Sequence, residues 1–164
     1  MQGGLQFLAS AVSSKCRSAS PFAWKENKVM RTHVQFVSDA FPSYPGEDEE
    51  INPGIWGKRL AEYLVSRLPE YGITPKEFYT EDWGWEIPIE NVEFPMFIGC
   101  SNQLEPGGNL FLCFIDPSKP KVRKGLFKSV DATEHIERVA KALDSILSKN
   151  PEIRELKWWE ENEK

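Results

Sequence analysis

The sequence predicts an α+β domain, a two-layer sandwich in which two helices cover one face of a mainly antiparallel sheet. Apolar residues recur at helical spacing over residues 60–68 and again over 136–147. Two short apolar runs, 96–100 and 110–115, follow each other with a Glu-Pro-Gly-Gly turn between them. The chain lacks the strand–helix alternation of parallel folds, and consecutive strands joined by turns pair antiparallel. The expected order is strand, helix, three strands and helix, with a further strand at 153–158.

The first strand is expected at 32–37, where apolar and polar residues alternate. Asn52-Pro53 predicts the start of the first helix, because asparagine caps well and proline suits the first helical position. The acidic run 47–50 lies just upstream, where it favours the positive end of the helix dipole. Gly57 lies one turn before Ala61, so the helix is expected to approach the sheet closely there.

The next strand is expected to run over residues 78–89, through the sequence Glu-Asp-Trp-Gly-Trp-Glu. In a regular strand Trp83 and Trp85 would point to the same face, because side chains alternate with period two. Gly84 between them favours a bulge or a close backbone approach, and a bulge would break that parity. The orientation of the two tryptophans therefore depends on the backbone at Gly84.

Length and composition indicate one domain in a chain of 164 residues with 40% hydrophobic residues. The net charge of −5 argues against general nucleic-acid binding, which needs a basic face. No apolar stretch reaches the roughly 18 residues that cross a bilayer, so no membrane partner is expected. The three cysteines form no CxxC pair, and we expect Cys100 and Cys113 to be buried thiols in a cytoplasmic protein.

The N-terminal residues 1–29 differ from the rest, because they are rich in serine and contain one acid, Glu26. We expect the folded domain to begin near Met30 and to comprise residues 30–164. Residues 1–29 are then an N-terminal extension that is mobile unless it docks on the domain.

Charge is distributed unevenly along the chain. The run 47–50 is wholly acidic, whereas five basic residues fall within 119–128, in a segment expected to be a loop or a short extended piece. Two interpretations stay open: both segments are solvated loops, or together they form a dipolar surface that orients a charged partner.

Carboxylates concentrate in the segment 81–86, where Glu81, Asp82 or Glu86 could serve as acid and base in a small hydrolase. A neighbouring tryptophan lowers the local polarity and can raise the pKa of a carboxyl group. Adjacent strand residues point to opposite faces, however, so Glu81 and Asp82 converge only on irregular backbone. We expect no cofactor, because the glycine-rich phosphate-binding and nucleophile-elbow motifs are missing.

No metal site is expected, because His33 and His135 fall in separate elements and neither belongs to an HxH or HExxH pattern. A Cys100–His33 nucleophile would need a cation or a helix dipole to activate the thiol, and the local sequence supplies neither. These observations leave binding as the leading hypothesis.

The binding hypothesis places Trp83 and Trp85, with Tyr44 and Trp56, in an aromatic floor whose rim carries Asp82. Such a surface suits a cationic or sugar-like small molecule, or a protein partner that presents lysine or arginine. A homodimer is one arrangement that the sequence allows. The alternative is that both tryptophans lie half-buried at the core edge and that the carboxylates cap loops.

The chain resembles a group of small uncharacterised bacterial proteins. The shared pattern is Asn52-Pro53-Gly54 opening a helix, then Glu81-Asp82-Trp83-Gly84-Trp85, then a strand that contains Gly99. The resemblance covers about residues 31–158. The chain is also similar in style and size to proteins encoded on mobile gene cassettes. It implies a self-standing bacterial domain and no particular activity.

Overall fold

The computed structural model describes residues 30–91, 93–126 and 128–159, so the expectations for residues 1–29 lie outside the described part of the chain. The described residues form a six-stranded sheet in the order β2-β3-β4-β5-β1-β8, in which all neighbouring strands are antiparallel. The strands of this sheet are β1 (His33–Ser38), β2 (Tyr79–Glu81), β3 (Gly84–Ile89), β4 (Met96–Asn102), β5 (Leu110–Asp116) and β8 (Ile153–Trp159).

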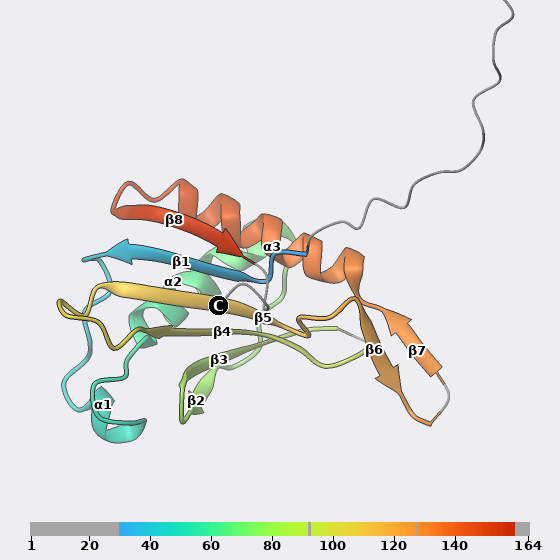
Figure 1. The fold of residues 1–164 in the computed structure, drawn as a ribbon, viewed down its shortest axis with the longest axis horizontal. Coiled ribbons are helices and arrows are strands. Elements are labelled where there is room, and N and C mark those ends of the chain that lie inside the picture. The colour runs from blue at the N-terminus through green and yellow to red at the C-terminus, as the bar shows by residue number, and fades with distance from the viewer. Residues whose placement is uncertain (1–29, 92, 127, 160–164) are drawn as a thin grey trace, which may run out of the picture.

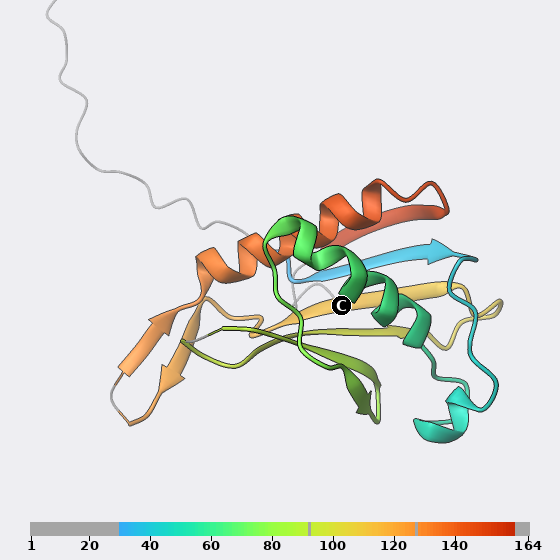
Figure 2. The ribbon, with the colours of Figure 1, turned by 180° about the vertical axis from the view of Figure 1, so that it is seen from behind.

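Both long helices lie on the same face of this sheet. Helix α2 (Lys58–Arg67) continues into a 3-10 turn, η1 (Leu68–Tyr71), and α3 (Thr133–Ser148) leads into β8, the last strand. Figure 2 shows the two helices in front of the sheet, and Figure 1 shows the opposite face without a helix; we call this the helix-free face. The predicted α+β fold with helices on one face is confirmed. Within the described residues, no helix combines the length and apolar character needed to cross a membrane.

The core lies between the helices and the sheet. Its largest fully buried side chains are Phe36, Ile87, Ile98, Phe111 and Ile115 from the strands, Leu60, Leu64 and Leu68 from α2 and η1, Ile73, and Ile136, Leu143 and Leu147 from α3. Cys100 and Cys113 face each other across β4 and β5 as buried free thiols, as predicted. Burial raises the pKa of both thiols, so neither is available as a thiolate.

Helix α2 begins at Lys58, later than the start predicted at Asn52-Pro53. That prediction is wrong because Gly54 adopts a φ of 81° and turns the chain out of helical geometry. The N-cap residue is instead Gly57, which has no side chain to cap with. The predicted close approach is confirmed, since a Cβ on Gly57 would lie 2.9 Å from the carbonyl oxygen of Cys100.

The segment 78–89 is a hairpin rather than the single strand predicted. Asp82 and Trp83 form its two-residue turn, and β2 and β3 pair directly across it. The turn lacks the Asn-Gly or Asp-Gly sequence that marks most two-residue hairpins, which is why the pattern suggested a continuous strand. The close approach predicted at Gly84 is confirmed, because a Cβ there would lie 2.6 Å from the Cys100 carbonyl oxygen.

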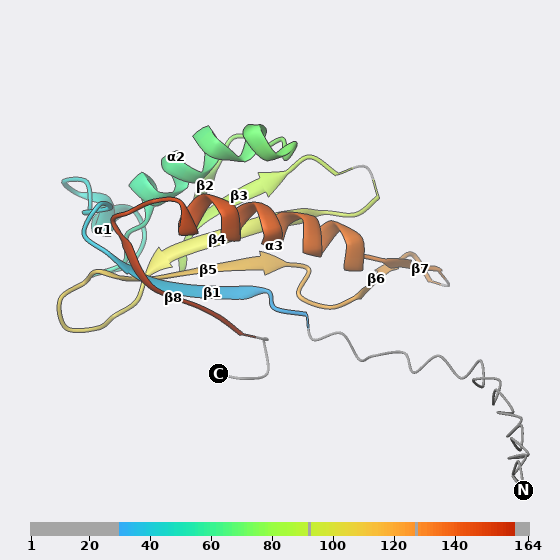
Figure 3. The same cartoon turned by 90° about the horizontal axis from the view of Figure 1, so that it is seen from above.

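A second, two-stranded sheet forms from the basic segment. Strand β6 (Lys121–Lys124) pairs antiparallel with β7 (Lys128–Asp131), and the opposed Val122 and Val130 pack against the core at its base. Beyond this pair the hairpin projects from one end of the molecule, away from the large sheet (Figures 1 and 3). We call residues 121–126 and 128–131 the arm.

The large sheet ends in two dissimilar edges. Strand β2 has only three residues. Strand β8 is irregular, because its register with β1 shifts between Gln35 and Val37, where Glu155 adopts a φ of 56°.

Candidate functional site

Gly84 sends the two tryptophans of the hairpin to opposite faces of the sheet. Its φ of 148° is a conformation that residues with a side chain rarely adopt, and it breaks the alternation expected of a regular strand. Trp85 is 4% exposed and belongs to the core under α2. Trp83 is half-buried on the helix-free face, where it contacts Phe97 and Phe114.

On the helix side, the buried carboxylate of Glu47 joins three segments of the chain. Its Oε1 accepts hydrogen bonds from the backbone N–H groups of Gly57 and Lys58, each at 2.7 Å, and from Trp85 Nε1 at 2.9 Å. Its Oε2 accepts the backbone N–H of Tyr44 at 2.9 Å. Glu47 therefore caps α2 from a distance in sequence, since two of its donors are the N–H groups of the N-cap residue and of the first residue of that helix.

The aromatic rings near this carboxylate are already covered by cations of the chain itself. The Arg59 guanidinium carbon lies 3.9 Å from the centre of the Tyr44 ring, and Lys58 Nζ lies 5.1 Å from the centre of the Trp85 ring. The Tyr44 hydroxyl donates to Glu62 at 2.8 Å, which raises the pKa of Tyr44. Tyr44 and Trp85 therefore do not belong to an open site, and the shared aromatic floor predicted from the sequence does not form.

Trp56 is also separate from Trp83. Its indole Nε1 donates to the Phe41 carbonyl oxygen at 3.3 Å, and its ring packs so closely on Gly108 that a Cβ there would lie 2.6 Å away. Trp56 therefore contributes to a different part of the surface from the one predicted.

The three carboxylates proposed for catalysis make no hydrogen bond to one another among the described residues. Glu81 and Asp82 are both exposed, Asp82 lies in the turn, and Glu86 accepts a hydrogen bond from the Tyr79 hydroxyl. This hydrogen bond raises the pKa of Tyr79 to about 12. No acid–base pair of these three residues forms in the described structure.

Replacing Glu86 by glutamine should lower the pKa of Tyr79 from about 12 toward its ordinary value of 10.0. The carboxylate stabilises the neutral phenol, and an amide accepts the same hydrogen bond without the negative charge. Because the folded-state pKa lies above the unfolded one, the stability from this bond is present below pH 10.0 and is lost as the pH rises toward about 12. The measurement is a pH titration of tyrosinate absorbance, with Tyr79→Phe identifying the signal. An unchanged titration in Glu86→Gln would contradict the assignment.

A cavity of about 460 Å³ opens on the helix-free face beside the hairpin turn. Its lining residues are His33, Ile55, Asp82, Trp83, Ser101, Asn102, Gln103, Leu104, Leu112 and Phe114. The Trp83 and Phe114 rings meet edge to face, with centroids 4.9 Å apart, and His33 stacks on Phe114. Gly99 lies beneath these rings, where a Cβ would approach the Phe114 ring to 2.3 Å. The absence of a side chain at Gly99 thus lets the aromatic wall lie against the sheet.

Three segments are tied together to form the cavity. Asn102 at the end of β4 accepts the Trp56 N–H at 2.8 Å and donates to the Gly54 carbonyl oxygen at 2.9 Å. The Asn52 side chain donates to the backbone carbonyl of Asp82 in the hairpin turn. The loop before α2 is therefore fixed both to β4 and to the turn that carries Trp83.

Of the predicted site residues, only Trp83 and Asp82 line this cavity. His33, Ser101, Leu104 and Phe114 were not predicted as members of the site. The apolar runs of β4 and β5 predict strands that are buried on both faces of the sheet. Their sequence therefore did not indicate that the helix-free face is partly open. Among the described residues, no group of three His, Cys, Asp or Glu side chains could hold a metal ion.

Comparison of the chain with protein-family models, with curated proteins and with solved structures gave no match. Function is therefore inferred from the geometry of the cavity alone.

Proposed function

We propose that this protein is a non-enzymatic binding domain whose cavity beside Trp83 takes the cationic group of a small molecule or of a protein partner. The observation that carries this proposal is the set of side chains that line the cavity. The Trp83 ring and the Asp82 carboxylate share one cavity, and none of the residues that line it is a lysine or an arginine.

An ammonium or guanidinium group is attracted to the face of an indole ring by about 0.5–2 kcal/mol, depending on how far it is desolvated. Asp82 adds an opposite charge at the same opening, and Ser101 and Gln103 add oxygen acceptors. Contacts with Phe97 and Phe114 hold the Trp83 ring in place, so little side-chain entropy is lost when a ligand binds.

Hydrolysis by Glu81, Asp82 or Glu86 is the alternative from the sequence. It requires two titratable groups within hydrogen-bonding reach of one another at the substrate. Of these three carboxylates only Asp82 lines the cavity, and Glu86 is engaged by the Tyr79 hydroxyl outside it. Binding is therefore the function that the cavity supports better.

We expect Nα-acetyl-lysine methylamide or Nα-acetyl-arginine methylamide to bind the full chain, with chemical-shift changes at the Trp83 indole in NMR titrations. Trp83→Ala should weaken this binding by about tenfold or more, and Asp82→Asn by about fivefold, since each removes one attraction for the cation. Circular dichroism and thermal unfolding should show that both variants stay folded, because Trp83 lies outside the core.

Tyr79→Ala and Glu90→Gln are the matched controls, because they remove an exposed aromatic ring and an exposed carboxylate that do not line the cavity. Both should bind the probes as the unchanged chain does. Equal affinities in the unchanged chain and in Trp83→Ala would rule out the proposed site.

A further inference from the structure

The arm carries a group of cations around an exposed apolar residue. Lys124 and Lys128 lie directly opposite each other at its outer end, and Arg123 lies one pair further in. Like charges directly opposed across two strands repel one another. In the described part of the chain no salt bridge engages these three side chains.

Leu126 lies in the turn that joins the two strands and is 91% exposed. Among the described residues the only other large apolar side chains classed as exposed are Tyr79 and Leu104, the latter at 74%. Leu104 lines the cavity beside Trp83. Two leucines thus remain in water on one chain, one at the tip of the arm and one at the mouth of the cavity.

The chemistry of the arm matches that of the cavity. The apolar part of the cavity wall, formed by Ile55, Leu104 and Leu112, suits a leucine side chain. Asp82 lies at the same opening and Glu81 is exposed next to it, so two carboxylates are available to two lysines. Complementary charge of this kind selects and orients a partner.

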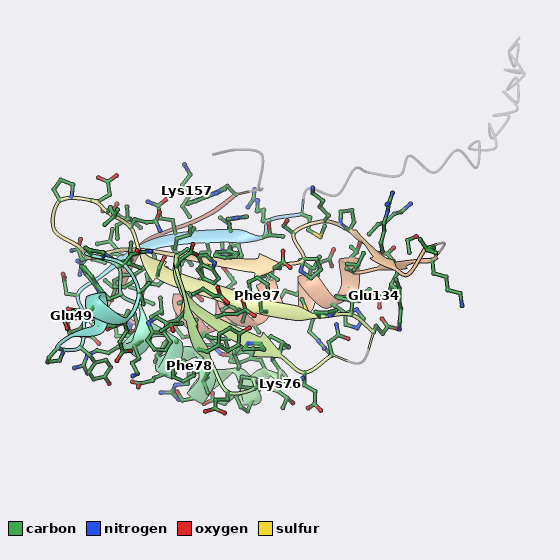
Figure 4. All side chains as sticks on the ribbon, turned by 90° about the horizontal axis from the view of Figure 1, so that it is seen from below. Glu49, Lys76, Phe78, Phe97, Glu134 and Lys157 are labelled. Carbon is green, nitrogen blue, oxygen red and sulfur yellow. The ribbon has the colours of Figure 1, made fainter. Side chains whose placement is uncertain are left out.

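The arm and the part of the cavity mouth formed by Leu104 in the β4–β5 loop lie toward opposite ends of the molecule. The arm projects from one end, and α1 (Glu47–Glu50) and the β4–β5 loop lie at the other (Figures 1 and 3). Figure 4 shows Glu49 of α1 at one end and Glu134, which follows the arm in the chain, toward the other. A two-fold axis perpendicular to the long direction of the molecule would place the arm of each copy beside the β4–β5 loop end of the other, so that the assembly closes.

We propose that the cationic partner of the cavity is a second copy of this chain, whose arm enters it with Leu126 against the apolar wall and Lys124 and Lys128 beside Glu81 and Asp82. This inference rests on the proposed function and names its partner. Burial of both exposed leucines and neutralisation of the opposed lysines are the changes that would favour the dimer.

The test is charge reversal in the full chain, measured by sedimentation velocity over a range of concentrations and salt. One variant carries Lys124→Glu with Lys128→Glu, and the other carries Glu81→Lys with Asp82→Lys. Each alone should dimerise at least about tenfold more weakly than the unchanged chain, whereas an equimolar mixture should recover the association, because both contacts again join opposite charges. Leu126→Ser should also weaken dimerisation, and added salt should weaken it in the unchanged chain.

Arg138→Glu with Lys141→Glu is the control, because it changes the net charge as the arm variant does but at two exposed positions of α3. It should dimerise as the unchanged chain does.

A monomer at all concentrations, or a mixture of the reversed variants that fails to associate, overturns the inference. If the chain stays monomeric while the lysine probe binds in a Trp83-dependent way, the second copy is wrong and the proposed function stands. If a dimer forms without any dependence on Trp83, Glu81 or Asp82, the arm–cavity contact is wrong.

Discussion

Glu47→Ala is expected to lower the free energy of unfolding by about 3–5 kcal/mol, because it leaves buried donors without an acceptor. The backbone N–H groups of Gly57 and Lys58 and the indole N–H of Trp85 all bond to one oxygen of this side chain, which is 2% exposed. Urea denaturation followed by tryptophan fluorescence measures the loss.

Glu47→Gln is a second variant that tests the acceptor role of the carboxylate without removing the side chain. It keeps the shape and one acceptor oxygen, but its amide nitrogen would meet the N–H donor of Tyr44 or those of α2. We expect a smaller loss of about 1–3 kcal/mol. Glu49→Ala is the control, since Glu49 belongs to the same acidic run but is exposed, and it should change stability by less than about 0.5 kcal/mol. Equal losses at Glu47 and Glu49 would contradict the capping role.

Gly84→Ala is expected to cost about 3 kcal/mol or more of unfolding free energy. Two terms add: the strain of an alanine at φ 148° and the collision of its Cβ with β4. The atoms in the way are the Cys100 carbonyl oxygen and Ser101 Cβ, both at 2.6 Å, and neither is the end of a flexible side chain.

Gly72→Ala separates the two terms. Gly72 also has a positive φ, of 70°, but a Cβ there meets nothing within 4 Å. It should therefore lose only about 1 kcal/mol, from backbone strain. Thermal and urea unfolding of both variants give the comparison, and a Gly84→Ala protein as stable as Gly72→Ala would show that β4 shifts freely to accept the methyl group.

The spacing of apolar residues predicted those helices and strands whose pattern is contained within their own segment. Residues 60–68 and 136–147 form helical segments because their apolar residues recur at helical spacing, and 96–100 and 110–115 pair as the predicted hairpin. The hairpin of the arm was not predicted because, among its described residues, only Val122 and Val130 are apolar and reach the core, which is too few to show an alternation.

The surroundings of the two tryptophans were harder to predict because they depend on contacts between residues far apart in the sequence. Glu47 stands in a run of four acids with no local sign that one of them is buried, and its donors come from other segments. Gly84 did identify the decisive backbone position, but no sequence pattern gives the sign of its φ angle. The division of Trp83 and Trp85 between two faces therefore became apparent only in three dimensions.

The dissimilar edges of the large sheet have a consequence for how copies of this chain can join. A long, flat edge strand offers a row of unpaired N–H and C=O groups to which a strand of another chain can pair, and such pairing leads to aggregation. Here one edge is three residues long, and the other is kinked at Glu155 and carries the exposed Lys157 (Figure 4). Neither outer strand is a good template, so contacts between copies are left to side chains, which favours assemblies of finite size over fibres.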